Sequence, residues 1–461
     1  MPFSGPADTI AAIATAPGEG AIAIVRVSGP DTYALADRFF RCPAPAPSAR
    51  AAGTFAHGHI AHPATGEVID DALLLIFRAP HSYTGENSVE IQCHGGSQAA
   101  QRILDALLSS GARQAEPGEF TKRAFLNDKL DLTQAEAVLD LIHARSERAA
   151  RLATAQLEDA LGLRIRALYA ALLAGAADIE AMLDFPDDEL PQSVPKEVAT
   201  RLSAISAEIQ SLLDTWREGH ILREGARIVI AGAPNTGKST LLNLLAGRER
   251  AIVSPHPGTT RDTIEEPVTL LGYPMQLVDT AGLRDAPCEI EQEGIRRTHR
   301  ALAEADLCIC LVDASRTLSA DEKAFLAAHD PQKMLVLLNK IDLGQSIRPE
   351  NIPWLDCLSV SLKKSPLLNE IIEKIVQKVV HQPSGGDHGS LAISERHRNA
   401  LFNALEDVKD AIFLLESGSE ADFLPAATYA RTALDSIGLI FGKNCTEEML
   451  NSIFSRFCVG K

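Results

Sequence analysis

The first part of the chain alternates between short strand-like runs and one helical run. Residues 21–29, 71–80 and 88–96 are apolar runs that end in turn residues, which is typical of β-strands. Residues 97–111 instead repeat apolar side chains at helical spacing and close on a glycine, as many helices do. We therefore expect residues 1–128 to form an α+β domain.

Helical spacing dominates from residue 129. Leu132, Ala135, Leu139 and Ile142 would share one face of a helix, and the same periodicity continues over residues 129–222. Such a series predicts a bundle of long helices, because each apolar face needs another helix to cover it.

Short apolar runs return after residue 222 and are separated by helical stretches. They include RIVIAG, MQLVD, LCICLVD and MLVLLN, and they indicate a parallel sheet wrapped by helices over residues 223–382. Residues 383–390, PSGGDHGS, have the composition of a flexible linker, and helical spacing resumes after them. We therefore predict that an α/β domain is inserted into a helical domain whose two segments, 129–222 and 383–461, pack together.

Composition narrows the class of protein. At 461 residues the chain exceeds one ordinary domain, and its net charge of −17 argues against broad electrostatic capture of nucleic acid, although a local basic patch would still serve. No apolar run approaches the roughly 20 residues of a membrane span, and no positive residue precedes Arg26, as a secretory signal would require. The eight cysteines form no C-x-x-C, and Cys308 and Cys310 point the same way from one strand. We expect a cytoplasmic protein with reduced thiols.

One glycine-rich stretch carries the strongest chemical signal. GAPNTGKST at residues 232–240 fits G-x-x-x-x-G-K-[ST], follows a predicted strand and opens a predicted helix. In that setting backbone amides and the helix N-terminus form an anion site. Lys238 would neutralise the β- and γ-phosphates, and the Ser239 hydroxyl would bind Mg²⁺. The alternative is a glycine-rich turn that binds nothing, which this context disfavours.

Two later motifs identify the nucleotide base. VDTAG at residues 278–282 places Asp279 to hold Mg²⁺ through water and the Gly282 amide to sense the γ-phosphate. NKID at residues 339–342 places Asp342 to accept two hydrogen bonds from guanine. Adenine would leave this carboxylate unpaired, at a cost of about 1–3 kcal/mol. The motifs therefore predict GTP.

Two further elements are expected to complete the base site. Asn339 would meet the opposite edge of the base, and LSVS at residues 358–361 lies where GTPases place a base-contacting loop, although it departs from the usual Ser-Ala-Lys. The three ordered motifs predict both binding and hydrolysis of GTP. The residues predicted to bind GTP are Asn235, Thr236, Gly237, Lys238, Ser239, Thr240, Ser254, Pro255, His256, Pro257, Gly258, Thr259, Thr260, Asp279, Thr280, Ala281, Gly282, Asn339, Lys340, Asp342, Ser359, Val360 and Ser361.

The segment between the first two motifs lies where a switch loop belongs. Its sequence is SPHPGTTRDT, and Thr260 is its natural second Mg²⁺ ligand. Many GTPases place a water-orienting glutamine directly after D-x-x-G, but here that position is Leu283. Glu289, Glu291 and Glu293 are candidates for the missing role, and a solvated acidic loop is the alternative.

The last residues of the chain are unusually apolar for a terminus. Ile453, Phe454, Phe457 and Val459 are poor material for a solvated tail, and the final lysine does not fit a prenylation box. We therefore expect the end of the chain to dock against a core.

The motifs together resemble one family. GAPNTGKST, GTTRD, DTAGLRD, RAFLNDKLDLTQAEA at residues 123–137 and the final FCVGK are similar, in order and over the full length, to the tRNA-modification GTPases of the MnmE (TrmE) family. The resemblance implies a multidomain fold. Its parts would be an α+β N-terminal domain that binds tetrahydrofolate and dimerises, a discontinuous all-α helical domain, and an inserted α/β P-loop GTPase domain of Ras-like type.

The resemblance also implies a reaction. The homodimer would assemble with the FAD-dependent protein MnmG (GidA) into a heterotetramer and modify the wobble uridine of tRNA at carbon 5 by aminomethyl or carboxymethylaminomethyl addition. The one-carbon donor would be 5-formyl- or 5,10-methylene-tetrahydrofolate. GTP hydrolysis would require Mg²⁺ and be activated by K⁺, which offsets developing charge where other systems insert an arginine.

Residue by residue, the resemblance assigns the remaining roles. Asn235, Ser254, His256 and Thr259 match the family's K⁺ ligands, and Glu291 matches its water-orienting glutamate. Ser239 and Thr260 remain the expected Mg²⁺ ligands.

The resemblance assigns a folate site as well. Arg26, Glu90, Lys129 and Lys461 match the family's folate contacts. A carboxylate suits the donor–acceptor edge of a pterin, and cationic side chains suit the anionic glutamyl tail. Cys458 would lie beside the one-carbon donor, either as a redox or nucleophilic group or as a buried small residue. The expected catalytic residues are Glu291, Lys238 and Cys458.

Two other classes of protein were weighed. A ribosome-assembly or RNA-binding GTPase switch without modification chemistry should show a G-x-x-G loop or a basic face, and it would leave the Cys-x-Gly-Lys end without a role. A membrane-associated signalling GTPase would need an anchor. We therefore predict a tRNA-modifying enzyme without a membrane partner.

Overall fold

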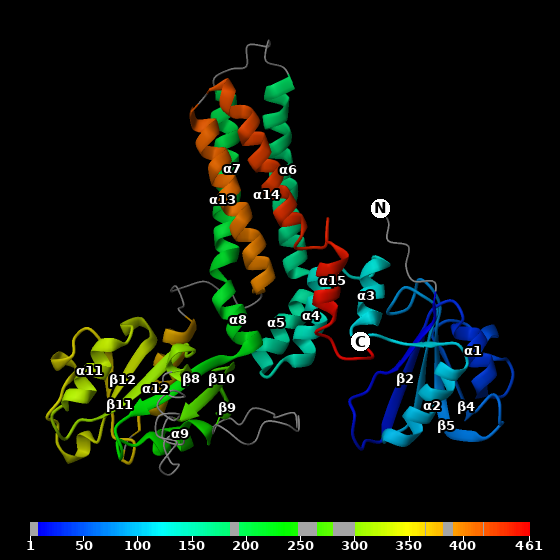
Figure 1. Ribbon diagram of the computed structural model, residues 1–461, viewed down its shortest axis with the longest axis horizontal. Helices are drawn as coiled ribbons and strands as arrows, with labels where there is room; N and C mark the ends of the chain where they lie inside the picture. The colour runs from blue at the N-terminus through cyan, green and yellow to red at the C-terminus, as the bar shows by residue number, and fades with distance from the viewer. Residues whose placement is uncertain are drawn as a thin grey trace. The chain divides into compact units, whose positions relative to one another are not determined.

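The computed structural model describes residues 8–184, 193–247, 265–279, 300–364, 366–380, 391–417 and 419–461 (Figure 1). It divides into two compact units. The first contains Met1–Leu139, Gly162–Ala170 and Leu434–Lys461, and the second contains Asp140–Leu161 and Ala171–Ala433. Each unit is therefore assembled from segments that are distant in the sequence.

The first unit is organised around a sheet whose strands follow the order β3-β4-β5-β6-β2-β1-β7. Among the described strands, neighbours are antiparallel except β1 and β7, which run in parallel. The strands are β1 (Ile10–Ile13), β2 (Ile22–Ser28), β3 (Phe40–Arg41), β4 (Thr54–Ala61), β5 (Val68–Phe77), β6 (Ser88–His94) and β7 (Arg113–Gln114). The three runs predicted as strands are present as β2, β5 and β6.

Helices α1 (Thr32–Phe39) and α2 (Ser97–Ser109) pack against the sheet of the first unit. Alternation along the strands explains this arrangement, because every second side chain points to the same face. Leu74 and Ile76 of β5 are buried in one cluster with Ile103 of α2. The helix predicted after the third strand is therefore α2, and it covers one face of the sheet.

A smaller helical cluster completes the first unit. It joins α3 (Glu119–Leu126), α4 (Leu132–His143) and α15 (Glu447–Phe454). Leu132 and Ala135 are buried against Phe454, as the predicted apolar face of this helix requires. Ile142, which was predicted to share that face, is instead 41% exposed. Ile142 lies in the predicted helix but outside this cluster, which does not extend along the last turn of α4.

The helical stretch after residue 129 is broken more often than its pattern suggests. It forms α4, α5 (Glu147–Leu157) and α6 (Ala160–Asp184). The Ser146 hydroxyl accepts a hydrogen bond from the Ala149 amide and so starts α5. Asp159 adopts a left-handed conformation, with φ 73°, and separates α5 from α6. Neither break involves a proline or a glycine, so apolar spacing alone did not reveal them.

The second unit contains a sheet with the strand order β13-β12-β11-β8-β10-β9. Only β9 is antiparallel to its neighbour among these described strands. The strands are β8 (Ala226–Gly232), β9 (Glu265–Leu270), β10 (Tyr273–Asp279), β11 (Leu307–Asp313), β12 (Met334–Asn339) and β13 (Asp356–Ser359). The helices of this part are α9 (Lys238–Ala246), α11 (Ala320–Ala328) and α12 (Leu368–Val380). This is the predicted parallel sheet with helices.

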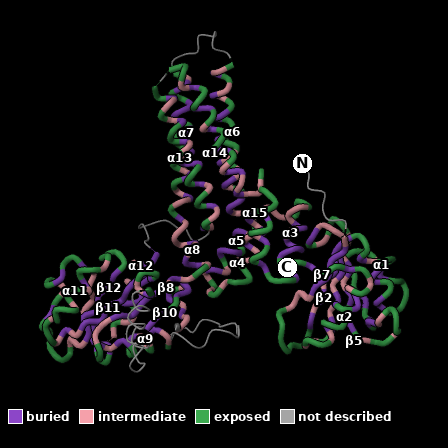
Figure 2. The backbone as a smooth tube through the Cα atoms, viewed as in Figure 1, coloured by how far each residue is buried: buried purple, intermediate pink, exposed green. Residues whose placement is uncertain are grey.

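Both faces of this second sheet are buried, as Figure 2 shows by the buried colouring along β8, β10, β11 and β12. In β11, Leu307 and Ile309 belong to the cluster on one face, whereas Cys308 and Cys310 belong to the cluster on the other. The two thiols therefore point the same way, as predicted. Burial raises the pKa of Cys308 to about 12 and that of Cys310 further, so both are neutral at physiological pH.

Long helices form the rest of the second unit. They are α7 (Ser193–Asp214), α8 (Trp216–Glu224) and α13 (Glu395–Ser417), together with most of α6 and most of α14 (Phe423–Gly438). Helix α7 precedes the sheet in the chain and α13 follows it, yet the two pack side by side (Figure 1). The helical segments on either side of the α/β insertion thus pair with each other, as the sequence predicted.

Helix α6 is long and apolar. Its buried side chains recur at intervals of three and four residues, at Leu161, Ile165, Leu168 and Leu172. By length and composition it could cross a membrane, a criterion that the core helices of soluble proteins also meet, and it is the one such helix in the described part of the chain.

Candidate functional site

The loop after β8 has a backbone that only glycine can complete. Gly232 ends the strand with φ 144°, and a Cβ there would overlap the carbonyl oxygen of Leu311 on neighbouring β11. Gly237 precedes α9 with φ 108°, and its Cβ would lie 2.6 Å from the Asn339 side-chain amide. A Cβ at either glycine would lie far inside the ordinary contact distance, so the loop wraps closely against the ends of β11 and β12. Its amides are thereby gathered at the start of α9.

A cationic side chain is folded into this loop. Lys238 is 9% exposed, and its Nζ donates hydrogen bonds to the carbonyl oxygens of Gly232 and Ala233, each at 3.0 Å. Lys238 is also the first residue of α9, so the ammonium group and the helix N-terminus add positive potential at one place. This arrangement suits a phosphate chain.

Oxygen ligands for a divalent cation lie at the same edge of the sheet. Ser239 follows Lys238 and is exposed, whereas Asp279 is the last residue of β10 and is 9% exposed. The register of the parallel strands pairs Asp279 with Ile230, two residues before the loop begins. A hydroxyl and a carboxylate are ligands that Mg²⁺ accepts, so these residues fit that ion.

The residues predicted to recognise the base are held in place by hydrogen bonds to neighbouring loops. Asn339, at the end of β12, donates from Nδ2 to the Thr236 carbonyl at 2.8 Å and accepts at Oδ1 from the Leu362 amide at 3.0 Å. The Ser361 hydroxyl donates to Asp342 at 2.8 Å. The hydrogen bond from Ser361 lowers the pKa of Asp342, with a smaller contribution from Lys364, whose Nζ lies 3.5 Å away. Asp342 is therefore an ionised acceptor at neutral pH.

Of the three residues predicted to form the base loop, Ser361 contacts Asp342, and the other two have different partners. Ser359 accepts a weak hydrogen bond from Gln345 at 3.3 Å, and Val360 is fully buried with its amide bonded to the Leu338 carbonyl. The contacts to Asn339 and Asp342 come from Ser361, which was predicted, and from Leu362 and Lys364, which were not. The signal was available, because Ser-Leu-Lys at residues 361–363 differs from Ser-Ala-Lys at one position.

A second group of candidate residues lies in the first unit. Arg26 of β2 and Glu90 of β6 are direct partners in the sheet register, and their side chains form an ion pair at 2.9 Å. The pair is largely buried, with side-chain exposures of 14% and 18%. The rings of Tyr83 and Phe120 flank the guanidinium, with centroids at 5.2 and 5.4 Å. A charged pair between aromatic rings suits a flat polar heterocycle.

The end of the chain docks beside this ion pair. Val459 forms a β-bridge with Pro117, and the Phe120 amide donates to the Lys461 carbonyl at 3.2 Å. Gly460 has φ 96°, and a Cβ there would overlap the carbonyl oxygen of Ile13. Its own carbonyl accepts a long hydrogen bond from Arg26, at 3.4 Å. The docked end predicted from its apolar residues is therefore observed.

The remaining two candidates take different positions around this tail. Lys129 donates from Nζ to the carbonyl of Pro80 at 3.1 Å, and its stem contacts the loop that carries Tyr83. Cys458 is exposed, and its carbonyl accepts a hydrogen bond from the Gly118 amide. The alternative that Cys458 is a buried small residue is therefore wrong.

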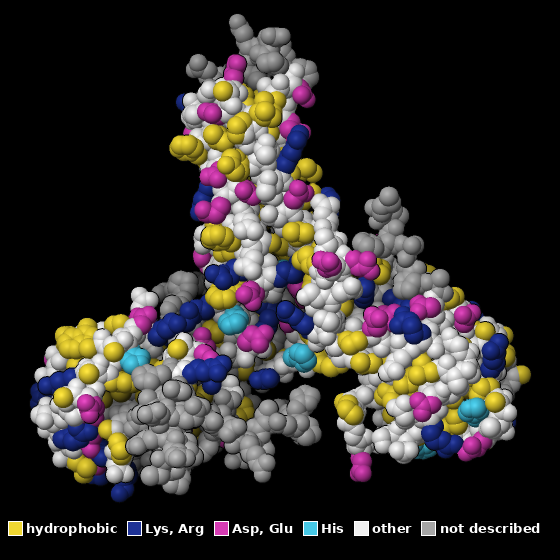
Figure 3. Space-filling model, in the orientation of Figure 1, with side chains coloured by type: hydrophobic (Ala, Val, Ile, Leu, Met, Phe, Trp, Pro, Cys, Tyr) yellow, Lys and Arg dark blue, Asp and Glu magenta, His cyan; other side chains and the backbone are white. Residues whose placement is uncertain are grey.

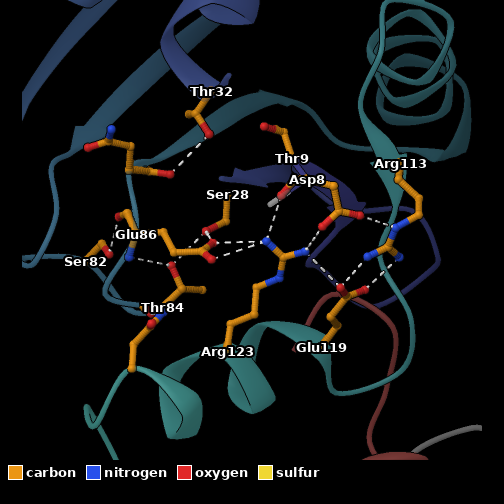
Figure 4. Close-up of polar contacts among 12 residues, drawn as sticks. Asp8, Thr9, Ser28, Thr32, Ser82, Thr84, Glu86, Arg113, Glu119 and Arg123 are labelled. Atoms are coloured by element: carbon orange, nitrogen blue, oxygen red, sulfur yellow. Dashed lines mark hydrogen bonds and ion pairs between the residues drawn. The ribbon is translucent and has the colours of Figure 1, made fainter. Parts of the chain in front are cut away.

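A buried cluster of charges fixes the surroundings of the tail (Figure 4). Arg123 of α3 is 1% exposed and bonds to Asp8 at 2.7 Å, to Glu119 at 3.0 Å and to Glu86 at 3.3 Å. Burial would raise the pKa of Glu119, but hydrogen bonds from Arg113 and the Glu116 amide, and then from Arg123, outweigh it and lower that pKa. The cluster ties α3, whose first amides hold the tail, to the start of the chain and to the loop before β6. No motif in the sequence predicts this cluster.

Comparisons with known proteins follow the same division of the chain. One family model, described as the GTP-binding protein TrmE N-terminus, matches residues 9–129, and another, the MnmE helical domain, matches residues 132–458. The tRNA modification GTPase MnmE of Geobacter metallireducens is 40% identical, covering 98% of this chain and 99% of that protein. That of Symbiobacterium thermophilum is 43% identical with the same coverage.

The chain belongs to the MnmE family of tRNA-modification GTPases.

Membership of the MnmE family confirms the resemblance and the fold class expected from the sequence. Among solved structures, the G domain of the T. maritima FeoB iron transporter is 25% identical, covering 33% of this chain and 98% of that chain with a TM-score of 0.26.

Several expected residues of the MnmE-type nucleotide site lie outside the described residues. They are Ser254, Pro255, His256, Pro257, Gly258, Thr259, Thr260, Thr280, Ala281, Gly282 and Glu291, together with Leu283, Glu289 and Glu293. Among the described residues, the phosphate-loop segment, Asp279 and the residues predicted to bind the base follow strand ends at one edge of the sheet. The switch loop and the water-orienting carboxylate stay predictions.

Proposed function

We propose that this chain is a K⁺-activated GTP hydrolase that, with an FAD-dependent partner, modifies the wobble uridine of tRNA at carbon 5 with a tetrahydrofolate one-carbon donor. The main support is a full-length match to tRNA-modification GTPases combined with two structural features. One unit carries the predicted phosphate-binding and base-binding residues at one edge of its sheet, and the other carries the docked Cys-x-Gly-Lys end of the chain. An ordinary GTPase switch has no use for the second feature.

In the nucleotide site, Lys238 would bind the β- and γ-phosphates while Asp342 and Asn339 read guanine. Mg²⁺ would be held by Ser239 and Thr260, with Asp279 acting through water, and would neutralise phosphate charge. The K⁺ ligands would be Asn235, Ser254, His256 and Thr259. The missing glutamine would be replaced by Glu291, which would orient the attacking water. Asn235 supports this scheme by its exposed position on the phosphate loop.

In the first unit, Arg26 and Glu90 would bind the folate together with Lys129 and Lys461. The aromatic rings beside Arg26 support this assignment, since they would stack on a pterin while Glu90 accepts its N–H groups. The tetrahydrofolate would supply the one-carbon unit. Cys458, exposed on the docked tail, would lie next to it and serve as a nucleophilic or redox group.

A homodimer is supported by the face of the first sheet that α1 and α2 leave uncovered. The register places Phe55, Leu75, Glu90 and Arg26 in one row across β4, β5, β6 and β2. Phe55 is 66% exposed and Ile22, on the same face, is 58% exposed. A second copy of the chain would cover these side chains and enclose the folate pair.

A tRNA partner is supported by a local basic region in an otherwise acidic chain. On the face shown in Figure 3, Lys and Arg side chains gather where α5 and α8 lie. Arg145, just before α5, and Arg151 of α5 are exposed, although Arg151 also pairs with Glu147, and exposed arginines bind phosphates. The modification itself would require a heterotetramer with MnmG in the cytoplasm.

We further propose four functional segments. Residues 1–128 would form the folate-binding and dimerisation domain, 129–222 and 383–461 the two parts of the helical domain, and 223–382 the GTPase domain. The pairing of α7 with α13 across the insertion supports this division.

The cation part of the proposal is tested by GTP turnover in matched salts. Replacing Na⁺ by K⁺ should raise turnover severalfold, and Asn235→Ala should abolish the difference between the two salts. Equal rates in K⁺ and Na⁺ for the unchanged protein would count against the cation site.

A further inference from the structure

An ion pair links the ends of two neighbouring strands behind the base site. Strand β11 ends at Asp313 and β12 ends at Asn339, and the register pairs these two residues directly. The next residue, Lys340, donates from Nζ to the Asp313 carboxylate at 2.6 Å. Its side chain is 28% exposed and that of Asp313 is 14% exposed, so solvent screens the pair only in part.

The Asp313 carboxylate is fixed on its other side as well. Its Oδ1 accepts from the Ser315 hydroxyl at 2.6 Å and from the Ser315 amide at 3.1 Å, while Oδ2 faces Lys340. Burial would raise the pKa of Asp313, but the hydrogen bonds from Lys340 and Ser315 outweigh it and lower that pKa. Asp313 is therefore ionised at neutral pH, and three hydrogen bonds orient its carboxylate.

The backbone of Lys340 adopts an unfavourable conformation that its contact with Asp313 helps to maintain. Lys340 has φ 66°, in the left-handed region that side chains with a Cβ rarely adopt. Such a conformation persists when its surroundings determine it, and the ion pair with Asp313 is one such determinant. The left-handed residue turns the chain so that Asp342, two residues later, extends toward Ser361.

Further hydrogen bonds tie the same two loops together. The Ala314 amide donates to the Asn339 carbonyl at 2.8 Å, and the Ser346 amide donates to the Ala314 carbonyl at 2.7 Å. The segment that carries Asp342 is thus attached at both ends to the segment that follows Asp313. The direction of the Asp342 carboxylate therefore depends on the position of the loop after Asp313, which is bonded to Asn339 and Ser346 on either side of Asp342.

We propose that Asp313 is a positioning residue for guanine recognition, which holds Lys340 and thereby the turn that aims Asp342 at the base. The inference rests on the proposed function in one respect, namely that Asp342 reads guanine. Asp313 itself contacts no nucleotide in this scheme. It acts on the geometry of one carboxylate, and that geometry decides which bases bind.

Comparing two ligands, GDP and IDP, distinguishes a positioning role of Asp313 from a general contribution to the stability of the fold. Guanine offers both N1–H and the 2-amino group to a carboxylate, whereas hypoxanthine offers N1–H alone. GDP should therefore bind more tightly than IDP by about tenfold or more, the value of one hydrogen bond to a charged group. A misaimed Asp342 loses this ratio, whereas general weakening of the fold lowers both affinities and leaves the ratio unchanged.

The experiment measures the dissociation constants of GDP and IDP by titration calorimetry on the full chain. Asp313→Asn should lower the GDP-to-IDP preference by about threefold or more, because the amide cannot hold the Lys340 ammonium as a carboxylate does. Asp330→Asn is the matched control, since Asp330 caps a short helical turn in the same sheet domain and asparagine caps equally well. It should leave the ratio unchanged.

Two further variants make the outcome decisive. In a Lys340→Met background, Asp313→Asn should have no additional effect on the ratio, because its partner is already gone. Ser315→Ala should lower the ratio in the same direction by a smaller factor, and it serves if Asp313→Asn does not fold. A GDP-to-IDP ratio that stays at the original value in Asp313→Asn and in Ser315→Ala overturns the proposal.

Failure of the underlying function would look different. Asp342→Ala should abolish the GDP preference outright. If Asp342→Ala retains it, the reading of guanine by Asp342 is itself wrong and the role of Asp313 falls with it. If Asp342→Ala loses the preference and Asp313→Asn keeps it, the proposed function stands and only the positioning role is refuted.

Discussion

Two candidate sites are built in opposite ways. The nucleotide edge of the second unit contains Lys238, Asp279 and Asp342, and the tail site of the first unit contains Arg26, Glu90 and the docked end of the chain. The nucleotide edge collects loops that directly follow parallel strands, so each motif is contiguous in sequence and its residues meet because strand ends meet. The tail site instead brings Gly460 to Arg26, which are 434 positions apart. A site of the first kind tolerates changes elsewhere in the chain, whereas a site of the second kind depends on how distant segments dock.

The strongest test of this contrast removes the cation of the phosphate loop. Lys238→Ala should lower GTP turnover by about 100-fold or more, because it removes the main charge that offsets the phosphates. Folate affinity, measured by fluorescence titration, should be unchanged, since Lys238 lies in the other unit. Loss of both activities would show that the two sites are not independent in the way described.

A smaller effect is expected when the docking of the tail is disturbed. Gly460→Ala places a Cβ against the Ile13 carbonyl in a left-handed backbone, so it should displace the tail and weaken folate binding by about tenfold. Gly53→Ala is the matched control, because Gly53 also has a positive φ, 73°, but open space around its Cβ position. Equal losses in the two variants would mean that backbone strain, rather than tail position, governs the site.

A single hydroxyl gives a still finer test within the nucleotide edge. Ser361→Ala should weaken GDP binding about fivefold, because it removes one hydrogen bond that orients Asp342. Ser359→Ala should have no effect on GDP affinity, since Ser359 faces Gln345. Both affinities are measured by calorimetry. A larger loss of GDP affinity in Ser359→Ala than in Ser361→Ala would mean that Ser359 contacts the base.

The buried charges around the tail predict an acid-sensitive first unit. The pKa of Asp8 is lowered by hydrogen bonds from Arg113 and Arg123, and that of Glu119 is also lowered. A carboxyl whose pKa is depressed in the folded state contributes stability above its unfolded pKa, near 4, and loses it as pH falls through the folded value. Glu119→Gln should therefore flatten the loss of stability below about pH 4, measured by urea unfolding. If Glu119→Gln loses unfolding free energy below about pH 4 as steeply as the unchanged protein does, the role of this cluster is contradicted.

The sequence predicted the nucleotide edge far better than the tail site. Lys238, Asp279 and Asp342 could be proposed from the sequence because each belongs to a motif that follows an apolar run, and those runs are strands of one sheet. The predicted base loop, residues 359–361, includes Ser361, which bonds to Asp342, whereas Leu362 and Lys364 were not predicted, because Leu362 does not look like the expected alanine. The docked tail was foreseen from its apolar residues, but Arg26 and Glu90 were assigned by family resemblance alone.

Other features depended on packing that no local pattern carries. Arg123 lies in an amphipathic helix like any surface arginine, and only the fold surrounds it with Asp8, Glu86 and Glu119. The breaks around α5 arise from a serine cap and a left-handed aspartate within a continuous helical pattern. Contacts between distant segments were therefore the part of the structure that the sequence left open.

The central claim is that two differently built sites serve one modification reaction. It is tested most directly by mass spectrometry of wobble nucleosides from cells that lack this protein and are complemented with variants. The account predicts that the unchanged chain restores the 5-substituted uridines, whereas Lys238→Ala and Gly460→Ala each fail to do so. Full modification with either variant, at normal protein levels, would contradict the claim.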